Sequence, residues 1–220
     1  MKAEAGSPLR VAVVEDHQLY REMLVSALAS QEGIAVTVTA AGAQEARALI
    51  SPGSIDVAVL DVELADGNGV ALGIQLRRKD PNVGVMLLSS HDVMELLLDL
   101  PPDVRRGWSY LSKSSAVSIE IVTRALRATA GGRTVLDPEL VHRAVPRRGS
   151  SLARLTPRQL EVLQLLATGL SNTGIAERLE ISERSIENHL NLAYAALDLP
   201  KSQNSRVSAV LRFIEETSRG

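Results

Sequence analysis

The amino-terminal half of the chain alternates short apolar runs with segments of helical periodicity, and this alternation restricts the fold more than any other feature. The apolar runs predict buried strands over residues 9–14, 34–40, 55–60, 83–88 and 108–111. The intervening segments predict helices over residues 17–30, 43–50, 70–78, 93–100 and 118–130. Strands that alternate with helices form parallel sheets. We therefore expect residues 1–130 to build a doubly wound α/β domain with a five-stranded, flavodoxin-like parallel sheet.

The carboxy-terminal half lacks a strand pattern. Residues 131–151 contain Gly, Pro, Ser and paired Arg, which predict a linker that holds a short helix over 138–145. The run Thr-Pro-Arg-Gln at 156–159 supplies the N-cap, the first-position Pro and the capping-box Gln of a helix. Residues 152–220 are therefore expected to form a small all-α domain. Its helices are predicted to begin near Thr156, Ser171, Ser182 and Ser205.

Charge is distributed unevenly between the halves. Residues 1–130 have 12 Lys and Arg against 16 Asp and Glu, whereas residues 131–220 have 12 against 10. The asymmetry is small, but it has the sign expected of an acidic signalling half and a half that binds nucleic acid. The chain has no Cys and no apolar run of the roughly 20 residues that span a bilayer. We therefore expect a soluble, cytoplasmic protein with no membrane partner.

Carboxylates follow two of the predicted strands. Glu15 and Asp16 end the first, and Asp61 ends the third. An Asp after a strand is more often a cap or turn residue, but carboxyl ends of parallel strands meet at one edge, where ligands bind. Grouped carboxylates favour Mg²⁺, which would leave one carboxylate oxygen free to attack a phosphoryl group. Ser89 and Lys113 end the last two strands and would supply a hydroxyl and a positive charge to the phosphoryl oxygens.

Residues 9–130 resemble the receiver domains of two-component systems. The resemblance rests on six residues, namely Glu15, Asp16, Asp61, Ser89, Tyr110 and Lys113. It implies that Asp61 accepts a phosphoryl group from a sensor histidine kinase with the help of Mg²⁺. It also implies a switch in which Ser89 and Tyr110 move together. We expect the metal ligands to be Glu15, Asp16, Asp61 and Glu63.

The chain departs from the receiver pattern near the switch. Ser114 stands where receivers often have Pro, and Arg106-Gly107-Trp108-Ser109 replaces the usual Gly-Ala pair before the last strand. Pro101-Pro102 interrupts the helix that usually forms the output face. These departures leave open a receiver that acts without phosphate, through dimer or ligand control.

The helix predicted from Ser182 divides into two faces. Ile186, Leu190, Ala193 and Leu197 form an apolar stripe, and a second face is polar. Most polar helix faces are merely solvated, but amides and guanidinium groups read base edges in the major groove. Residues 155–199 resemble the helix-turn-helix of the NarL/FixJ (LuxR-type) regulators, which implies binding to double-stranded promoter DNA. The expected DNA contacts are Arg184, Ser185, Glu187, Asn188, His189 and Asn191.

The last predicted helix carries a narrow apolar stripe of Val207, Val210, Leu211 and Ile214. Such a stripe packs at least in part on its own domain, but the resemblance assigns this helix a role in pairing. Residues 151–220 have eight Lys and Arg and eight Asp and Glu, so a single copy gains little from DNA phosphates. We therefore expect an active homodimer.

An enzyme is the weaker alternative. Asp61-Val62-Glu63 after an apolar strand is faintly similar to the motif of haloacid-dehalogenase-type phosphohydrolases. That family needs a later acidic pair, and the sequence has no matching pair after Lys113. We therefore expect a regulator and not an enzyme.

Overall fold

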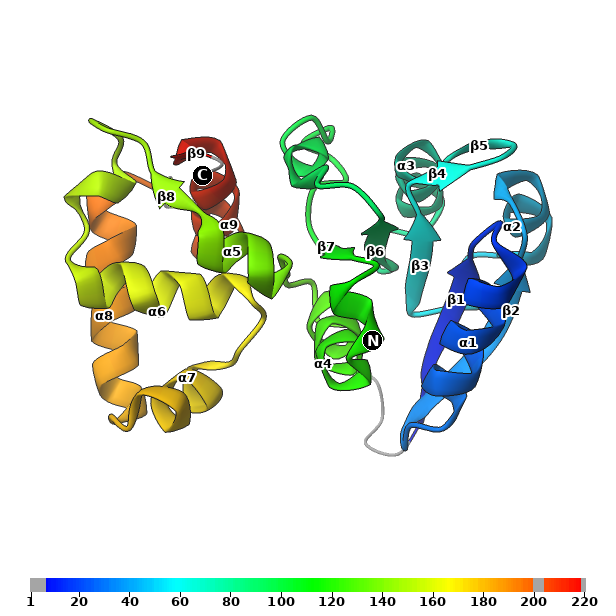
Figure 1. Cartoon of the computed structure of the whole chain (residues 1–220), viewed down its shortest axis with the longest axis horizontal. Helices are drawn as coiled ribbons and strands as arrows, with labels where there is room; N and C mark the ends of the chain where they lie inside the picture. The colour runs from blue at the N-terminus through cyan, green and yellow to red at the C-terminus, as the bar shows by residue number, and fades with distance from the viewer. Residues whose placement is uncertain (1–6, 200–203, 219–220) are drawn as a thin grey trace.

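The computed structural model describes residues 7–199 and 204–218, which form two parts side by side (Figure 1). The first part is built on a parallel sheet with the strand order β2-β1-β3-β6-β7. This order is the doubly wound, flavodoxin-like arrangement that the sequence predicts. The sheet strands are β1 (Leu9–Val14), β2 (Ile34–Ala40), β3 (Val57–Asp61), β6 (Gly84–Ser89) and β7 (Trp108–Ser112).

Helices cover both faces of this sheet. Helices α1 (Gln18–Ala29) and α4 (Ile119–Ala130) pack together on one face, and α2 (Ala43–Leu49) and α3 (Gly69–Lys79) pack together on the other. Strands β3 and β6 are buried along their whole length, as expected of central parallel strands covered twice. With both faces covered, ligands can reach the sheet only at the ends of its strands, and in open α/β sheets they bind at the carboxyl ends.

Two segments of the first part differ from the sequence prediction. The helix predicted over 93–100 forms only as a short 3₁₀ helix, η1 (Met94–Leu97), so the predicted length is wrong. Pro101 restricts the backbone of Leu100, so no helix can continue past that residue. The turn after β3 also holds two unpredicted strands, β4 (Glu63–Leu64) and β5 (Gly67–Asn68), which form an antiparallel hairpin.

The second part consists mainly of α6 (Pro157–Ala167), α7 (Asn172–Leu179), α8 (Glu183–Ala196) and α9 (Ser205–Glu216), with the 3₁₀ turn η3 (Leu152–Arg154) before them. Thr156 and Gln159 form the predicted capping box, and Ser171 and Ser182 cap α7 and α8. No helix in the described ranges is both long and apolar enough to cross a membrane. This half also holds one short strand pair that the sequence does not predict, in which β8 (Val145–Pro146) pairs with β9 (Thr217–Ser218).

The segment between the two parts is firmly packed. Its helix α5 (Pro138–Arg143) is shorter than predicted and follows the 3₁₀ turn η2 (Ser115–Val117) and α4 in the chain. Val135 and Leu136 are buried. One hydrophobic cluster runs from the α2–α3 face of the sheet through η1 to α6, α8 and α9. Since α9 also packs against η1, the two parts share a core rather than hanging on a loose tether.

Candidate functional site

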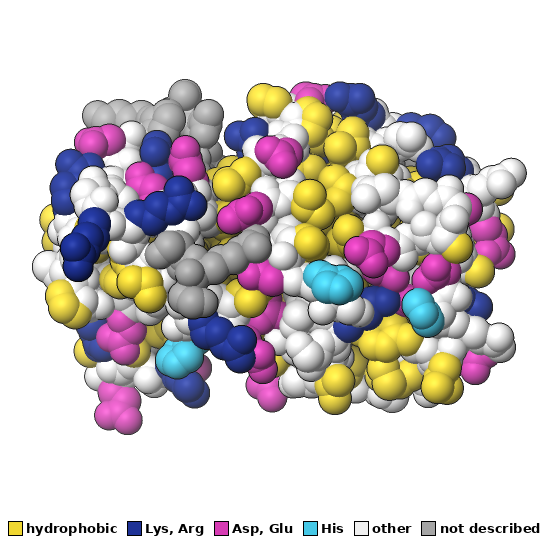
Figure 2. Space-filling view, turned by 45° about the horizontal axis from the view of Figure 1, so that its top comes forward, with side chains coloured by type: hydrophobic (Ala, Val, Ile, Leu, Met, Phe, Trp, Pro, Cys, Tyr) yellow, Lys and Arg dark blue, Asp and Glu magenta, His cyan; other side chains and the backbone are white. Residues whose placement is uncertain are grey.

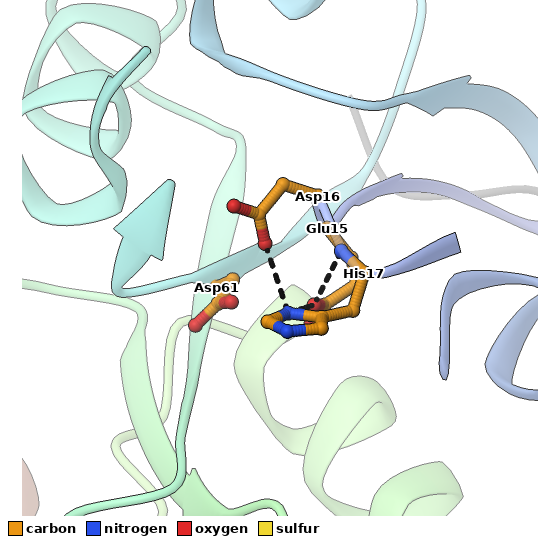
Figure 3. Close-up of side chains that lie close together, drawn as sticks. All are labelled: Glu15, Asp16, His17 and Asp61. Carbon is orange, nitrogen blue, oxygen red and sulfur yellow. Dashed lines mark hydrogen bonds and ion pairs between the residues drawn. The ribbon is translucent and has the colours of Figure 1, made fainter. Parts of the chain in front are cut away.

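The predicted carboxylates meet at the carboxyl edge of the sheet. Glu15 and Asp16 follow β1, Asp61 ends β3, and ligand atoms of these three residues and of His17 all lie within 4.8 Å of one another (Figure 3). Glu15 and Asp61 are almost fully buried. Strands β1 and β3 are direct neighbours in the sheet, so their ends necessarily bring these groups together.

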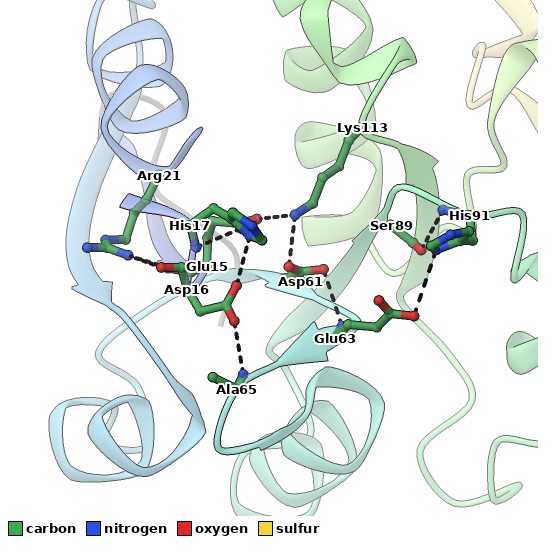
Figure 4. A network of polar contacts seen from close by, with 10 residues as sticks. All are labelled: Glu15, Asp16, His17, Arg21, Asp61, Glu63, Ala65, Ser89, His91 and Lys113. Carbon is green, nitrogen blue, oxygen red and sulfur yellow. Dashed lines mark hydrogen bonds and ion pairs between the residues drawn. The ribbon is translucent and has the colours of Figure 1, made fainter. Parts of the chain in front are cut away.

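Lys113 neutralises part of this negative charge. It follows β7, and its Nζ lies 2.8 Å from Asp61 Oδ2 and 2.7 Å from Glu15 Oε2 (Figure 4). Burial raises the pKa of Glu15, and the bond from Lys113 only partly offsets this effect. Burial acts to lower the pKa of Lys113, but its bonds to Asp61 and Glu15 outweigh burial and raise it. One cation is therefore held between two crowded carboxylates.

The donor set fits a magnesium ion. Asp16 accepts a bond from Ala65 N (3.0 Å) through Oδ2. Its buried Oδ1 accepts no hydrogen bond of good geometry from the described residues, and its imidazole neighbour, His17 Nδ1, lies at 3.2 Å. Mg²⁺ prefers such carboxylate oxygens. Glu63 is not brought into the cluster: its side chain is 72% exposed and its Oε1 lies 3.8 Å from His91 Nδ1. Among the predicted ligands, the structure brings together Glu15, Asp16 and Asp61.

The two predicted switch residues hold the same backbone segment. Ser89 Oγ accepts a bond from His91 N (3.0 Å), and Tyr110 Oη donates to His91 O (2.5 Å). Tyr110 Oη also accepts from Val93 N (3.4 Å), one residue before η1 begins. A shift of Ser89 toward a phosphoryl group would therefore alter the hydrogen bonds of Tyr110 and the position of the segment that leads into η1.

Three neighbours of the acidic cluster were not predicted from the sequence. His17 Nδ1 lies 3.2 Å from Asp16 Oδ1, and Arg21 donates to the Glu15 carbonyl (Figure 4). The Tyr20 ring lies 4.9 Å from Lys113 Nζ. Burial raises the pKa of Tyr20 to about 12, so it stays neutral. Their positions in the sequence could have indicated them, because all three lie at or just before the start of the helix that directly follows the acidic pair.

The predicted DNA-reading face of α8 is open. Arg184, Glu187, Asn188 and Asn191 are exposed, and Ser185 and His189 are half-buried. Ser185 also serves the helix itself, because its N–H donates to the Ser182 cap at 3.1 Å. The apolar stripe of the same helix faces α6 and α7, with Ile186 and Ala193 fully buried. The predicted DNA-reading face, called the recognition face below, is thus exposed to solvent in this conformation.

The predicted pairing stripe on α9 lies mostly inside the chain. Val207, Val210 and Ile214 are buried, and only Leu211 is half-buried. Helix α9 packs on α6 and on η1. A dimer contact through this stripe stays a prediction, and it would require a change in how α9 is packed.

A doubly wound domain with a carboxylate cluster and a strand-end Lys, joined to a helix-turn-helix, defines a class: DNA-binding regulators controlled by phosphorylation. Comparison with known families agrees with this class. Residues 11–118 match the response regulator receiver domain, and residues 153–210 match the bacterial regulatory proteins of the luxR family.

The chain aligns over most of its length with known regulators. The chain is 30% identical over 207 residues to the DNA-binding transcriptional activator DevR/DosR of Mycobacterium tuberculosis, covering 91% of this chain and 94% of that protein. It is 28% identical to VraR of Staphylococcus aureus, covering 87% and 91%. The crystal structure of response regulator ChrA from a heme-sensing two-component system has a TM-score of 0.50 and 28% identity, covering 95% and 98%.

The chain therefore belongs to the NarL/FixJ (LuxR-type) family of two-component response regulators. It is a transcriptional regulator with a receiver domain and a DNA-binding domain. A receiver domain joined to a DNA-binding domain makes the chain a transcription factor.

Proposed function

We propose that this regulator is switched by phosphorylation of Asp61. The observation that carries the proposal is the position of its carboxylate, which is 4% exposed, next to Glu15 and Asp16 and bonded to Lys113 at 2.8 Å. Asp61 Oδ1 also accepts from Glu63 N at 3.2 Å, so the carboxylate is held in one orientation. It is the one carboxylate that ends the central strand of the sheet.

The surrounding residues have distinct parts in this reaction. Glu15, Asp16 and Asp61 would hold Mg²⁺, which when bound supplies positive charge beside the incoming phosphoryl group. An oxygen of Asp61 forms the new bond to phosphorus as the bond from phosphorus to the donor histidine nitrogen breaks. Lys113 and Ser89 then bind phosphoryl oxygens through their ammonium and hydroxyl groups.

A sensor histidine kinase is the proposed donor, and the surface beside the site suits its docking. Leu19 is 82% exposed, Val117 76% and Met23 46%. Hydrophobic side chains gather next to acidic and histidine side chains on this face of the receiver (Figure 2). Leu19 and Met23 are four residues apart on α1, so they share one helix face. Exposed apolar side chains that gather into one patch mark interaction surfaces.

The proposed output is promoter binding by a dimer in the cytoplasm. The exposed face of α8 carries Arg184, Asn188 and Asn191, whose groups suit base edges. The module around it has balanced charge, so one copy binds DNA phosphates weakly. Joining two copies raises avidity by roughly 10²–10⁴. Phosphorylation therefore needs only to favour the dimer to control DNA binding.

The acceptor assignment is tested by mass. Incubation with a small-molecule phosphodonor and Mg²⁺ should add one phosphoryl group to the wild-type protein and none to Asp61→Asn. Asp56→Asn is the matched control, because Asp56 directly precedes the same strand but bonds to Arg10 at the opposite edge. Persistent labelling of Asp61→Asn would place the acceptor elsewhere.

A further inference from the structure

Asp137 is a buried carboxylate that phosphoryl transfer does not use. It is 0% exposed, and it ends the segment between the receiver and α5. Its two oxygens have separate partners. Oδ1 caps α5 by accepting from Glu139 N (2.9 Å) and Leu140 N (3.3 Å). Oδ2 accepts from both the N–H (2.8 Å) and the hydroxyl (2.7 Å) of Ser112.

Ser112 directly precedes the phosphate-sensing Lys113. Lys113 reaches Asp61 through its side chain, and its N–H donates to Ser89 O at 2.8 Å. The Ser112 hydroxyl also accepts from Ser115 N (3.1 Å), which fixes the turn after β7. A displacement of Lys113 toward a phosphoryl group would therefore also displace the N–H and hydroxyl of Ser112, which bond Asp137.

The same segment is fastened to the DNA-binding domain. Val135 O accepts from Tyr110 N in β7 at 2.8 Å, whereas Leu136 N donates to Ala167 O at the end of α6, also at 2.8 Å. A Cβ at Gly169, where φ is +87°, would lie 2.8 Å from Val135 Cγ2. Residues 135–137, the coupling segment, are thus bonded to the switch strand on one side and to α6 on the other.

We propose that Asp137 is a positioning residue that couples the end of β7 to the DNA-binding domain. A buried carboxylate is costly unless its oxygens are hydrogen-bonded. If Ser112 moves with Lys113, Asp137 Oδ2 must move with it or lose its hydrogen bonds. Asp137 Oδ1, which caps α5, belongs to the same rigid carboxylate and must move as well. Movement of Ser112 therefore moves α5 and the segment bonded to α6. This inference rests on the proposed phosphorylation of Asp61.

The test is the ratio of DNA affinities with and without beryllofluoride, a phosphoryl mimic, on the full chain. Asp137→Asn keeps the volume and one capping oxygen, but its NH₂ cannot accept from Ser112. We expect this variant to be phosphorylated at the wild-type rate while its affinity ratio falls roughly tenfold, as for typical coupling between sites. Ser112→Ala should lower the ratio less, Ser112→Thr should restore it, and Ser112→Ala combined with Asp137→Asn should add little.

Glu216→Gln is the matched control. Glu216 Oε2 likewise accepts from a Ser hydroxyl (Ser151, 2.7 Å) and a backbone N–H (Leu152, 2.9 Å), but it does not contact β7. It should leave the ratio near the wild-type value. Coupling is reciprocal for binding equilibria, so DNA should raise beryllofluoride affinity in wild type by the same factor and in Asp137→Asn by much less. If Asp137 had a merely structural role, its replacement would not change the effect of DNA on beryllofluoride affinity.

Two results would overturn the inference: an unchanged ratio in folded Asp137→Asn, or an equal loss in Glu216→Gln. Should Asp137→Asn fail to fold, an unchanged ratio in Ser112→Ala would have the same meaning. Failure of the proposed function would give a different result, because the DNA affinity of the wild-type protein itself would then not change with beryllofluoride.

Discussion

At the residue scale, Lys113 has the clearest experimental signature. It pairs with two predicted metal ligands but is not itself one. We expect Lys113→Ala to bind Mg²⁺ at least as well as wild type, because a competing positive charge is removed. The variant should lose the response to a phosphoryl mimic. Trp108 lies buried in β7, so its fluorescence reports this response, and the exposed Lys79→Ala is the control. Loss of Mg²⁺ binding in Lys113→Ala would contradict this assignment.

A second residue-scale prediction concerns pH. Burial acts to raise the pKa of Asp56, but the hydrogen bonds and charge of Arg10 outweigh it and lower this pKa. Since the folded-state pKa lies below the unfolded value of about 4, the ionised carboxylate stabilises the fold above that pH. This stability is lost as pH falls through the lower folded value. Asp56→Asn should therefore be less stable at pH 7, by below about 1 kcal/mol for a partly exposed pair.

Thermal unfolding of wild type and Asp56→Asn at pH 7 and pH 3 measures this effect. The difference in stability should shrink at the lower pH, because the unfolded chain then protonates Asp56 and part of the advantage of the ionised carboxylate is lost. An equal difference at both pH values would mean that the side-chain charge is not what matters there.

Some site residues were predictable from sequence and others were not, for a physical reason. Asp61, Ser89 and Lys113 each end or follow a buried strand, and parallel strands bring their ends together whatever the loops do. Glu63 and Asp137 depend on the path of the chain after a strand. The β4–β5 hairpin leaves the Glu63 side chain exposed, and the coupling segment carries Asp137 back to β7.

At the scale of elements, the open face of α8 makes a direct prediction about DNA. Asn188 and Asn191 are both exposed on it. If each reads a base edge, its replacement by Ala should cost roughly 1–3 kcal/mol and relax preference at one position of the site. A DNA selection from random fragments, followed by titration, measures both effects. Asn82→Ala, an exposed receiver residue, is the control. Wild-type binding by both α8 variants would mean that another face docks.

Periodicity predicted the elements well except where a local sequence rule competed with it. The helices of the second part begin at the predicted caps, because Thr156, Ser171 and Ser182 satisfy free N–H groups. The 93–100 segment has helical apolar spacing, yet the two prolines beyond it leave only η1. Strand β9 has only two residues, and its pairing with β8 depends on tertiary position rather than on pattern.

At the scale of the whole molecule, the shared hydrophobic core determines which surfaces are covered before activation. Helix α9 packs against η1, and η1 begins one residue after Val93, which bonds to Tyr110. The pairing stripe and the output side of the receiver therefore cover each other in this conformation. The recognition face of α8 needs no uncovering, so control by phosphorylation should act on dimerisation rather than on access to DNA.

This arrangement predicts that α9 leaves η1 when the dimer forms. Three of the four stripe residues are buried within the chain, and a helix cannot offer the same atoms to two partners at once. Beryllofluoride should therefore cause two changes together: lower hydrogen-exchange protection of the η1 amides and a higher sedimentation coefficient of the protein.

Leu211 is the half-buried member, so Leu211→Asp is the change that the docked fold tolerates best. It should weaken dimerisation and specific DNA binding in parallel and leave Asp61 phosphorylation unchanged. Glu215→Gln, four residues further along α9 and exposed, should affect neither property. A Leu211→Asp protein that stays monomeric with beryllofluoride yet binds its DNA site like wild type would show that pairing through α9 is not the controlled step.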